Sequence, residues 1–141
     1  MIQKSATAEW AGGLKDGSGT VATESGALSG IPYSYATRFD GQKGSNPEEL
    51  VGAAHASCYA MFLSALMGGA GLTGTKVSAT STITLDPATE GSPSVTAAHL
   101  TVHVTADASE TVIRELADKA KVACPISKLL KAEITLAVTI G

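Results

Sequence analysis

One stretch of the chain, residues 46–71, constrains the fold more than any other: NPEELVGAAHASCYAMFLSALMGGAG. Asn46 is a favourable N-cap, Pro47 suits the first helical position, and the acidic Glu48 favours the positive end of the helix dipole. The run continues through small and apolar residues until two glycines stop it. Because its apolar residues lie nearly all the way round, we expect one long central helix enclosed by protein.

Length and charge narrow the class of protein. A chain of 141 residues is long enough for one core, so we expect a single domain over residues 1–141. The net charge of −3 without a basic cluster argues against a nucleic-acid partner. Polar residues interrupt the central apolar stretch, which favours a core helix over a membrane span. The first residues, MIQKSATAEWAGG, contain no apolar run typical of an export signal, so we expect a cytoplasmic protein.

The rest of the chain predicts short strands and two further helices. Alternating and β-branched patterns predict strands at residues 6–13, 19–25, 33–39, 77–85, 95–105 and 133–140. A helix follows the Ser109 cap, a short helix is expected over residues 125–131, and residues 86–94 read as a hairpin loop. The predicted fold class is therefore α+β, with a mostly antiparallel sheet and a long buried central helix.

Two cysteines, Cys58 and Cys124, are the first candidates for chemistry. They are either buried small hydrophobes or reactive thiols. Cys124 precedes Pro125 at an expected helix start, where the N-terminal field lowers the pKa of a thiol. Cys58 lies mid-helix and needs a neighbouring cation to become reactive. From local physics alone, Cys124 is the more activated thiol.

The histidines offer weaker signals. His55 lies three residues before Cys58 on the same helical face, which fits either a Cys–His couple or a hydrogen-bonded core histidine. His99 and His103 are four residues apart on an expected strand and so share a face. With a cysteine they would make an incomplete metal site, and this pattern has low specificity.

Four segments together resemble one known family. They are TRF at residues 37–39, GSNPEEL at 44–50, AAHASC at 53–58 and ACPIS at 123–127. This pattern is similar to the OsmC/Ohr family, the osmotically inducible protein C and organic hydroperoxide resistance proteins. The likeness extends from Thr7 to Ile140. It implies an intertwined homodimer that acts as a thiol-dependent antioxidant peroxidase on organic hydroperoxides, in the response to osmotic and oxidative stress.

The resemblance also implies roles for particular residues. Cys58 matches the peroxidatic cysteine and Cys124 the resolving cysteine, while Arg38 and Glu48 match the guanidinium and carboxylate that attend the thiolate. An arginine at position 38 is typical of the OsmC branch, since the Ohr branch has it nearer the N-terminus. The implied cycle forms a sulfenic acid and then a disulfide, which an external dithiol, of lipoyl type in the Ohr branch, reduces. No metal or organic cofactor is implied.

The sequence differs from the family pattern at two positions beside Cys58, and the separation of Glu48 from Cys58 bears on how the site is assembled. Ser57 and Tyr59 flank Cys58 where the family would have Ala and Phe, which adds hydroxyl groups near the sulfur. Glu48 and Cys58 are ten residues apart, about 15 Å along one straight helix. We therefore expect Glu48 to serve the Cys58 of a second chain across a two-fold axis, unless a kink returns it to its own.

Two other functions remain open from the residues. The first is a thiol hydrolase or acyl transferase that uses Cys58 with His55. The second is a non-catalytic binding or stress protein.

Overall fold

The computed structural model describes residues 1–88 and 91–141, so the middle of the expected hairpin loop lies outside the described residues. The described chain forms two compact units, Met1–Leu50 and Val51–Gly141. The first unit contains one three-stranded sheet, and the second contains another, with the longer helices.

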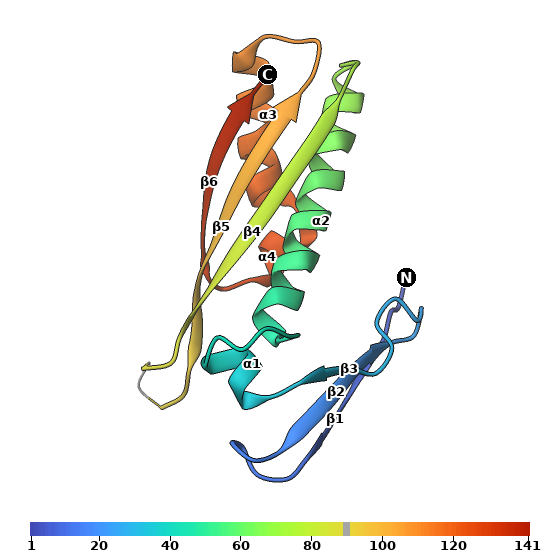
Figure 1. Cartoon of the computed structure of the whole chain (residues 1–141). Coiled ribbons are helices and arrows are strands. Elements are labelled where there is room, and N and C mark those ends of the chain that lie inside the picture. The colour runs from blue at the N-terminus through green and yellow to red at the C-terminus, as the bar shows by residue number, and fades with distance from the viewer. Residues whose placement is uncertain (89–90) are drawn as a thin grey trace. The chain divides into compact units, whose positions relative to one another are not determined.

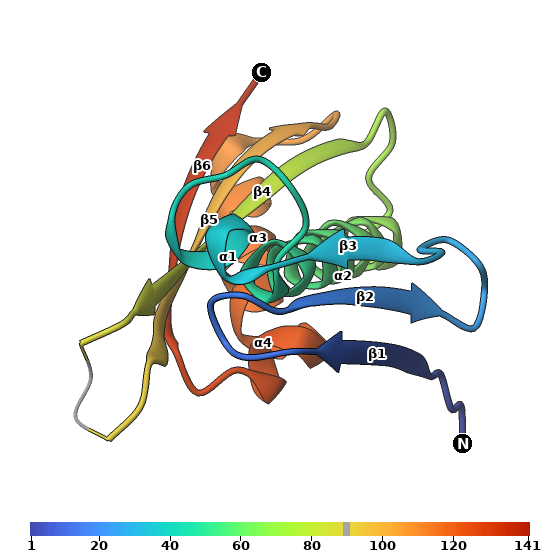
Figure 2. The same cartoon turned by 60° about the horizontal axis from the view of Figure 1, so that its bottom comes forward.

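The N-terminal sheet runs in the order β1-β2-β3, all antiparallel, with β1 at Ala6–Ala11, β2 at Ser18–Thr23 and β3 at Ile31–Tyr33 (Figure 2). Gly19 in the middle strand pairs with Trp10 on one side and Tyr33 on the other. A Cβ at Gly19 would lie 2.8 Å from the Trp10 ring and 2.7 Å from the Tyr33 ring. Two aromatic rings therefore occupy the space that a side chain would need.

The segment after β3 is helical, which corrects the strand expected over residues 33–39. Residues Tyr35–Phe39 form a short helix, α1, and the strand β3 ends at Tyr33. The reason is a capping box: the Thr37 backbone N–H donates to the Ser34 hydroxyl, and the Ser34 N–H donates to the Thr37 hydroxyl. The aromatic residues of this segment alternate as in a strand, but the capping box stabilises a helix.

The long central helix is confirmed as α2, Pro47–Gly69. Asn46 caps it, because its side-chain oxygen accepts a hydrogen bond from the Glu49 N–H at 2.9 Å. Within the single chain, however, the helix is not enclosed on all sides. It buries a single stripe of residues: Gly52, His55, Tyr59, Leu63 and Met67. Other apolar residues remain exposed, Met61 among them, at 76%.

The length and composition of α2 would also allow it to cross a membrane, a test that core helices of soluble proteins pass too. His55 belongs to the buried stripe, and both its ring nitrogens are hydrogen-bonded to serines. A polar group fixed in this way favours the core-helix interpretation.

The C-terminal sheet runs in the order β4-β5-β6. Strands β4 (Lys76–Asp86) and β5 (Ser94–Thr105) are antiparallel, whereas β6 (Glu133–Ile140) is parallel to β5. The parallel pairing requires a crossover. It is supplied by α3 (Glu110–Ala123) and α4 (Pro125–Leu129). Helices α2 and α3 cover one face of the sheet (Figure 1), and the core forms between helices and sheet from α2, β5 and α3 side chains.

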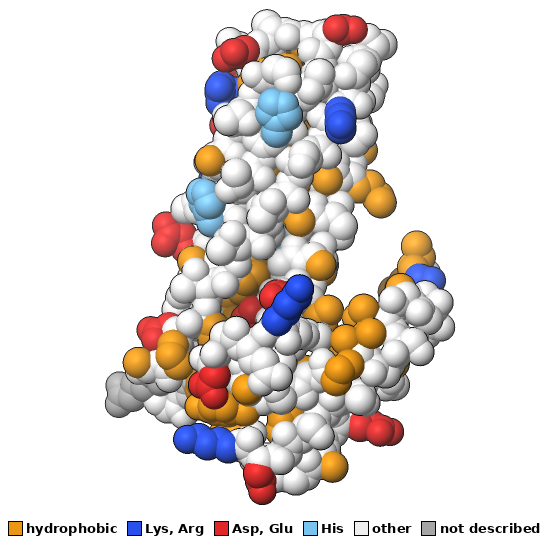
Figure 3. All heavy atoms as spheres, viewed as in Figure 1, with side chains coloured by type: hydrophobic (Ala, Val, Ile, Leu, Met, Phe, Trp, Pro, Cys, Tyr) orange, Lys and Arg blue, Asp and Glu red, His pale blue; other side chains and the backbone are white. Residues whose placement is uncertain are grey.

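The other face of this sheet is polar and exposed, and Figure 3 shows histidine side chains on it. His99 hydrogen bonds through Nδ1 to Thr135 at 2.6 Å, and His103 in the same way to Thr139 at 2.9 Å. Four residues along a strand span about 13 Å, so the two histidines cannot bind one ion together. In the described part of the chain, no group of three His, Cys, Asp or Glu side chains is placed to hold a metal.

Candidate active site

The two cysteines, 66 residues apart in sequence, meet in the C-terminal unit. The Sγ atoms of Cys58 and Cys124 lie 3.0 Å apart, and both are free thiols. Cys58 projects from α2 and is half-buried, while Cys124 joins α3 to α4 and is fully buried. A disulfide is about 2.05 Å long, so the sulfurs need to approach by only about 1 Å to bond.

The two thiols differ in pKa. Burial raises the pKa of Cys58, and its hydrogen bond with Cys124 raises it further, against a smaller lowering by the Ile126 backbone. Burial also raises the pKa of Cys124, but hydrogen bonds from Cys58, Ser127 and Ile126 together outweigh burial and lower its pKa. Within this unit Cys124 is therefore the more acidic thiol, as its position before Pro125 predicted.

His55 does not form the Cys–His couple considered from the sequence. Its Nδ1 lies 2.7 Å from the Ser81 hydroxyl oxygen and its Nε2 lies 2.9 Å from that of Ser127. The ring is fully buried, and burial lowers the pKa of His55, which keeps the ring neutral near pH 7. With both nitrogens engaged by serines, His55 is not placed to act directly as a base toward Cys58.

Arg38 and Glu48 meet in the N-terminal unit. The Arg38 Nε lies 3.1 and 3.2 Å from the two carboxylate oxygens of Glu48, and an Nη lies 2.7 Å from Oε1. Asn46 holds the pair's two helices together, because its amide donates to the Thr37 carbonyl oxygen of α1 while its oxygen caps α2. The pair is partly buried, with Glu48 only 13% exposed. The carboxylate thus fixes the guanidinium plane through a multidentate contact.

An aromatic pocket adjoins this arginine. A cavity of about 260 Å³ is lined by seven residues of the N-terminal unit: Trp10, Leu14, Tyr33, Ser34, Tyr35, Arg38 and Phe39. The Arg38 guanidinium lies over the Phe39 ring at 5.2 Å, and Tyr35 packs on Phe39 with ring centroids 4.9 Å apart. The pocket therefore offers a mostly apolar surface beside the fixed positive charge of Arg38.

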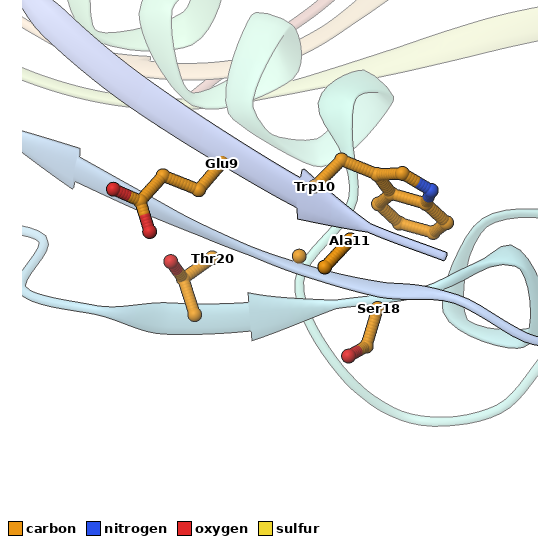
Figure 4. Close-up of a pocket in the computed structure, with 6 residues that line it drawn as sticks. Glu9, Trp10, Ala11, Ser18 and Thr20 are labelled. Carbon is orange, nitrogen blue, oxygen red and sulfur yellow. The ribbon is translucent and has the colours of Figure 1, made fainter. Parts of the chain in front are cut away.

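A larger groove of about 470 Å³ runs along the β1–β2 hairpin. Figure 4 shows Glu9 and Thr20 next to one another across these strands. Among its lining residues Glu9 is the only ionisable one, so the groove offers no acid–base pair.

The hydroxyl groups that flank Cys58 in sequence are bonded elsewhere. Ser57 donates to the Ala54 carbonyl oxygen of its own helix, and Tyr59 donates across the core to the Ala117 carbonyl oxygen at 3.1 Å. Burial is the main cause that raises the pKa of Tyr59 well above its ordinary value. The Tyr59 hydroxyl therefore stays protonated and serves packing.

Two serines at the site were not singled out from the sequence. Ser81 arrives from the inward face of β4, and Ser127 follows Cys124 in the first turn of α4. Ser127 was visible only as part of the ACPIS segment, and nothing local marks Ser81, since its partner His55 lies 26 residues away.

Comparison with known proteins shows the family of the chain. The family model described as OsmC-like protein matches residues 40–139. The chain is 44% identical over 135 residues to the peroxiredoxin OsmC of Escherichia coli, covering 96% of this chain and 94% of that protein. This chain belongs to the OsmC family.

Solved structures agree on the fold. An organic hydroperoxide resistance protein of Bacillus subtilis superposes with a TM-score of 0.67 at 21% identity, covering 97% of this chain and 98% of its own. One from Elizabethkingia anophelis gives a TM-score of 0.71 at 22% identity, covering 100% of this chain and 96% of its own. The OsmC-like α+β architecture predicted from the sequence is therefore confirmed.

Proposed function

We propose that this OsmC family member is a cysteine-based peroxidase that reduces organic hydroperoxides to alcohols. The observation that carries the proposal is the thiol pair: two free cysteines with sulfurs 3.0 Å apart, one half-buried and one fully buried. The 44% identity to a peroxiredoxin supports the same chemistry. A pair at this distance can be oxidised and closed without rearrangement of either helix.

In the proposed cycle the Cys58 thiolate attacks the terminal oxygen of the hydroperoxide. The O–O bond breaks, Cys58 becomes a sulfenic acid, and the alkoxide takes a proton to become the alcohol. Cys124 then attacks the Cys58 sulfur to form a disulfide with loss of water. An external dithiol, which we propose to be of lipoyl type, restores both thiols by exchange. These steps need no metal or organic cofactor.

Cys58 needs a cation to act as the nucleophile, because burial and Cys124 both raise its pKa. We propose that Arg38, held by Glu48, supplies it. A guanidinium beside the sulfur favours the thiolate and stabilises the alkoxide that develops as the O–O bond breaks. Glu48 lies in the first turn of α2, about 15 Å before Cys58 along a straight helix. The pair therefore fits the Cys58 of a second chain better than its own.

A homodimer is the arrangement that would place the pair in this way. Two features support it: α2 buries one stripe and leaves apolar residues such as Met61 exposed, and every residue of β1 is exposed. A second copy would cover such surfaces. In this proposal the two units of a chain together form one OsmC-like domain. The two free thiols also fit a location in the cytoplasm, where reducing conditions keep cysteines unpaired.

Cross-chain supply can be tested by complementation. Cys58→Ser and Glu48→Ala chains would be coexpressed with different tags and the heterodimer isolated. One of its two sites would then combine an intact Cys58 with an intact Glu48 from the other chain. We expect activity that neither homodimer shows. An inactive heterodimer would instead mean that Glu48 serves its own chain.

The pocket beside Arg38 supports an organic substrate. Its lining is mostly aromatic and aliphatic, so it suits the carbon part of a hydroperoxide, which hydrogen peroxide lacks. We expect Phe39→Ala to raise KM for cumene hydroperoxide and to leave the reaction with hydrogen peroxide unchanged. Equal losses with both peroxides would argue that the pocket does not bind substrate.

The function itself is tested by stopped-flow consumption of cumene hydroperoxide by the prereduced protein, with free thiols counted before and after. We expect rapid loss of both thiols in the wild type and none in Cys58→Ser. In Cys124→Ser we expect a single turnover that stalls. A thiol hydrolase would keep its turnover in Cys124→Ser, and a non-catalytic binding protein would consume no peroxide in any form.

A further inference from the structure

A chain of hydrogen bonds leads from β4 to Ser127, which lies on α4 shortly after the resolving Cys124. Ser81 on β4 contacts His55 Nδ1 at 2.7 Å, and His55 Nε2 contacts Ser127 Oγ at 2.9 Å. Ser127 follows Cys124 in the first turn of α4, and its side chain lowers the pKa of the Cys124 thiol. His55 is fully buried and Ser127 is 5% exposed. The proposed peroxidase cycle assigns no role to His55 or Ser127. Burying a polar imidazole is costly unless it is hydrogen-bonded, so these contacts are needed to keep His55 in the core.

The chain of contacts has a consistent direction when Cys124 is a thiolate. A thiolate only accepts, so the Ser127 hydroxyl donates to it, and Ser127 Oγ is then free to accept from His55 Nε2–H. This fixes the neutral tautomer with its proton on Nε2. Nδ1 is then the acceptor for the Ser81 hydroxyl. Each donor in the series therefore points toward the Cys124 sulfur, and each bond polarises the next.

We infer that His55 is a positioning residue for disulfide closure: anchored by Ser81, it turns the Ser127 hydroxyl toward Cys124 so that this sulfur attacks as a thiolate. This inference rests on the proposed peroxidase function. It assigns His55 to the resolving thiol, although His55 is nearer in sequence to Cys58.

The assisted step is the condensation of the two cysteines. The Cys124 thiolate forms a bond to the Cys58 sulfenic sulfur with its own electron pair, and the S–O bond breaks. The oxygen leaves as hydroxide and takes up one proton, equal to the one that Cys124 gave up, to form water. The Cys124 sulfur is oxidised and the Cys58 sulfur reduced, so no further oxidant or reductant is needed. Donation from Ser127 raises the fraction of Cys124 ready to attack.

The surroundings of Cys124 agree with this role. From α4, the Ser127 hydroxyl and the backbone of Ser127 and Ile126 lower the pKa of the thiol against the effect of burial. From α2, Cys58 contacts the sulfur, and Tyr59 is the other titratable group in electrostatic contact with it. Asp118 on α3 acts on Tyr59. None of these groups of the C-terminal unit is a cation, so within this unit neutral hydrogen-bond donors, Cys58 first among them, stabilise the Cys124 thiolate.

The test measures the pKa of Cys124 directly, in a Cys58→Ser background where it is the only thiol. Ultraviolet absorbance of the thiolate would be followed against pH. We expect His55→Leu and Ser127→Ala each to raise this pKa by about one unit, the size of one charge-assisted hydrogen bond. His55→Gln retains a donor near the Nε2 position and should restore most of the shift. Because His55 acts through Ser127, the double variant should show no more than Ser127→Ala alone.

A kinetic readout in the background with both cysteines separates the two steps. Sulfenic acid formation at Cys58 should keep its rate in His55→Leu, whereas closure of the disulfide near neutral pH should slow about tenfold, with its pH profile moved to higher pH. Met67→Leu, another buried position of α2, is the matched control and should change neither quantity.

The outcomes distinguish this inference from the proposed function. An unchanged Cys124 pKa in both His55→Leu and Ser127→Ala, with normal hydroperoxide turnover in the wild type, overturns the role of His55 alone. Wild-type protein that loses no thiols to hydroperoxide overturns the function, whatever the pKa values are. If His55→Leu does not fold, Ser127→Ala and His55→Gln decide the question.

Discussion

Two glycines of the same helix should respond in opposite ways to alanine. Gly52 faces β4, where a Cβ would lie 2.8 Å from the Ser81 carbonyl oxygen and 3.6 Å from the Ile83 side chain. Gly68, near the other end of α2, has nothing within 4 Å of its would-be Cβ. The pair isolates close packing from helix propensity, because both substitutions are Gly→Ala in one element.

The magnitudes follow from these distances. In a helix interior, replacing glycine by alanine gains about 0.5–1 kcal/mol, and at Gly68, next to the last residue of α2, we expect a gain toward the lower end of this range. At Gly52 the same gain is offset by a contact that backbone atoms must relieve, and overpacking costs about 1–3 kcal/mol. We therefore expect Gly52→Ala to lower the free energy of unfolding by about 1–2 kcal/mol. Moving Ser81 also disturbs its bond to His55.

Urea denaturation at one fixed protein concentration measures both changes, because the stability of a dimer depends on concentration. The expected result is a lower midpoint for Gly52→Ala and a slightly higher one for Gly68→Ala. If both variants gained stability equally, the close approach of α2 to β4 at Ser81 would be wrong.

Three further predictions follow from the site. Arg38→Lys loses the multidentate contact with Glu48 and should lower kcat/KM for cumene hydroperoxide by roughly tenfold or more. The same change at the exposed Arg114 is the control and should leave kcat/KM unchanged. Equal effects at the two positions would refute the role of Arg38. The free energy of unfolding should fall as pH drops below 6.5, because His55 binds a proton in the unfolded chain but, with its lowered pKa, stays neutral when it is buried in the fold. If the unfolding free energy of His55→Gln depended on pH as steeply as that of the wild type, this explanation would be wrong. Tyr59→Phe should lower the free energy of unfolding by about 1 kcal/mol, because the Ala117 carbonyl oxygen loses the hydroxyl that donates to it. Thermal unfolding that matches the wild type would count against that bond.

The sequence was most informative where local signals agree. Asn46, Pro47 and the apolar run that follows predict α2, since capping and propensity act within a few residues. The same local reasoning failed at residues 33–39, where aromatic residues alternate as in a strand. There the side chains of Ser34 and Thr37 satisfy each other's backbone N–H groups, and helix α1 forms.

Contacts between distant residues could not be predicted in the same way. The lowered pKa of Cys124 could be predicted from the helix start at Pro125. Its approach to Cys58 could not, because it depends on how the crossover through α3 folds back, and no local sequence pattern describes that path. The partners of His55 come from β4 and α4, 26 and 72 residues away. An all-round apolar helix was expected to be enclosed, and a single chain encloses one stripe of it.

The central claim is that Cys58, although the less acidic thiol of the isolated pair, is the one that hydroperoxide oxidises. The most direct measurement is the intact mass, with peptide mapping, of prereduced Cys124→Ser and Cys58→Ser proteins after one equivalent of cumene hydroperoxide. We predict one added oxygen atom on Cys58 in the first variant, with an equal amount of alcohol formed, and no oxidation in the second. Oxygen on Cys124 in the Cys58→Ser protein, with Cys58 left reduced in the other, would contradict the assignment.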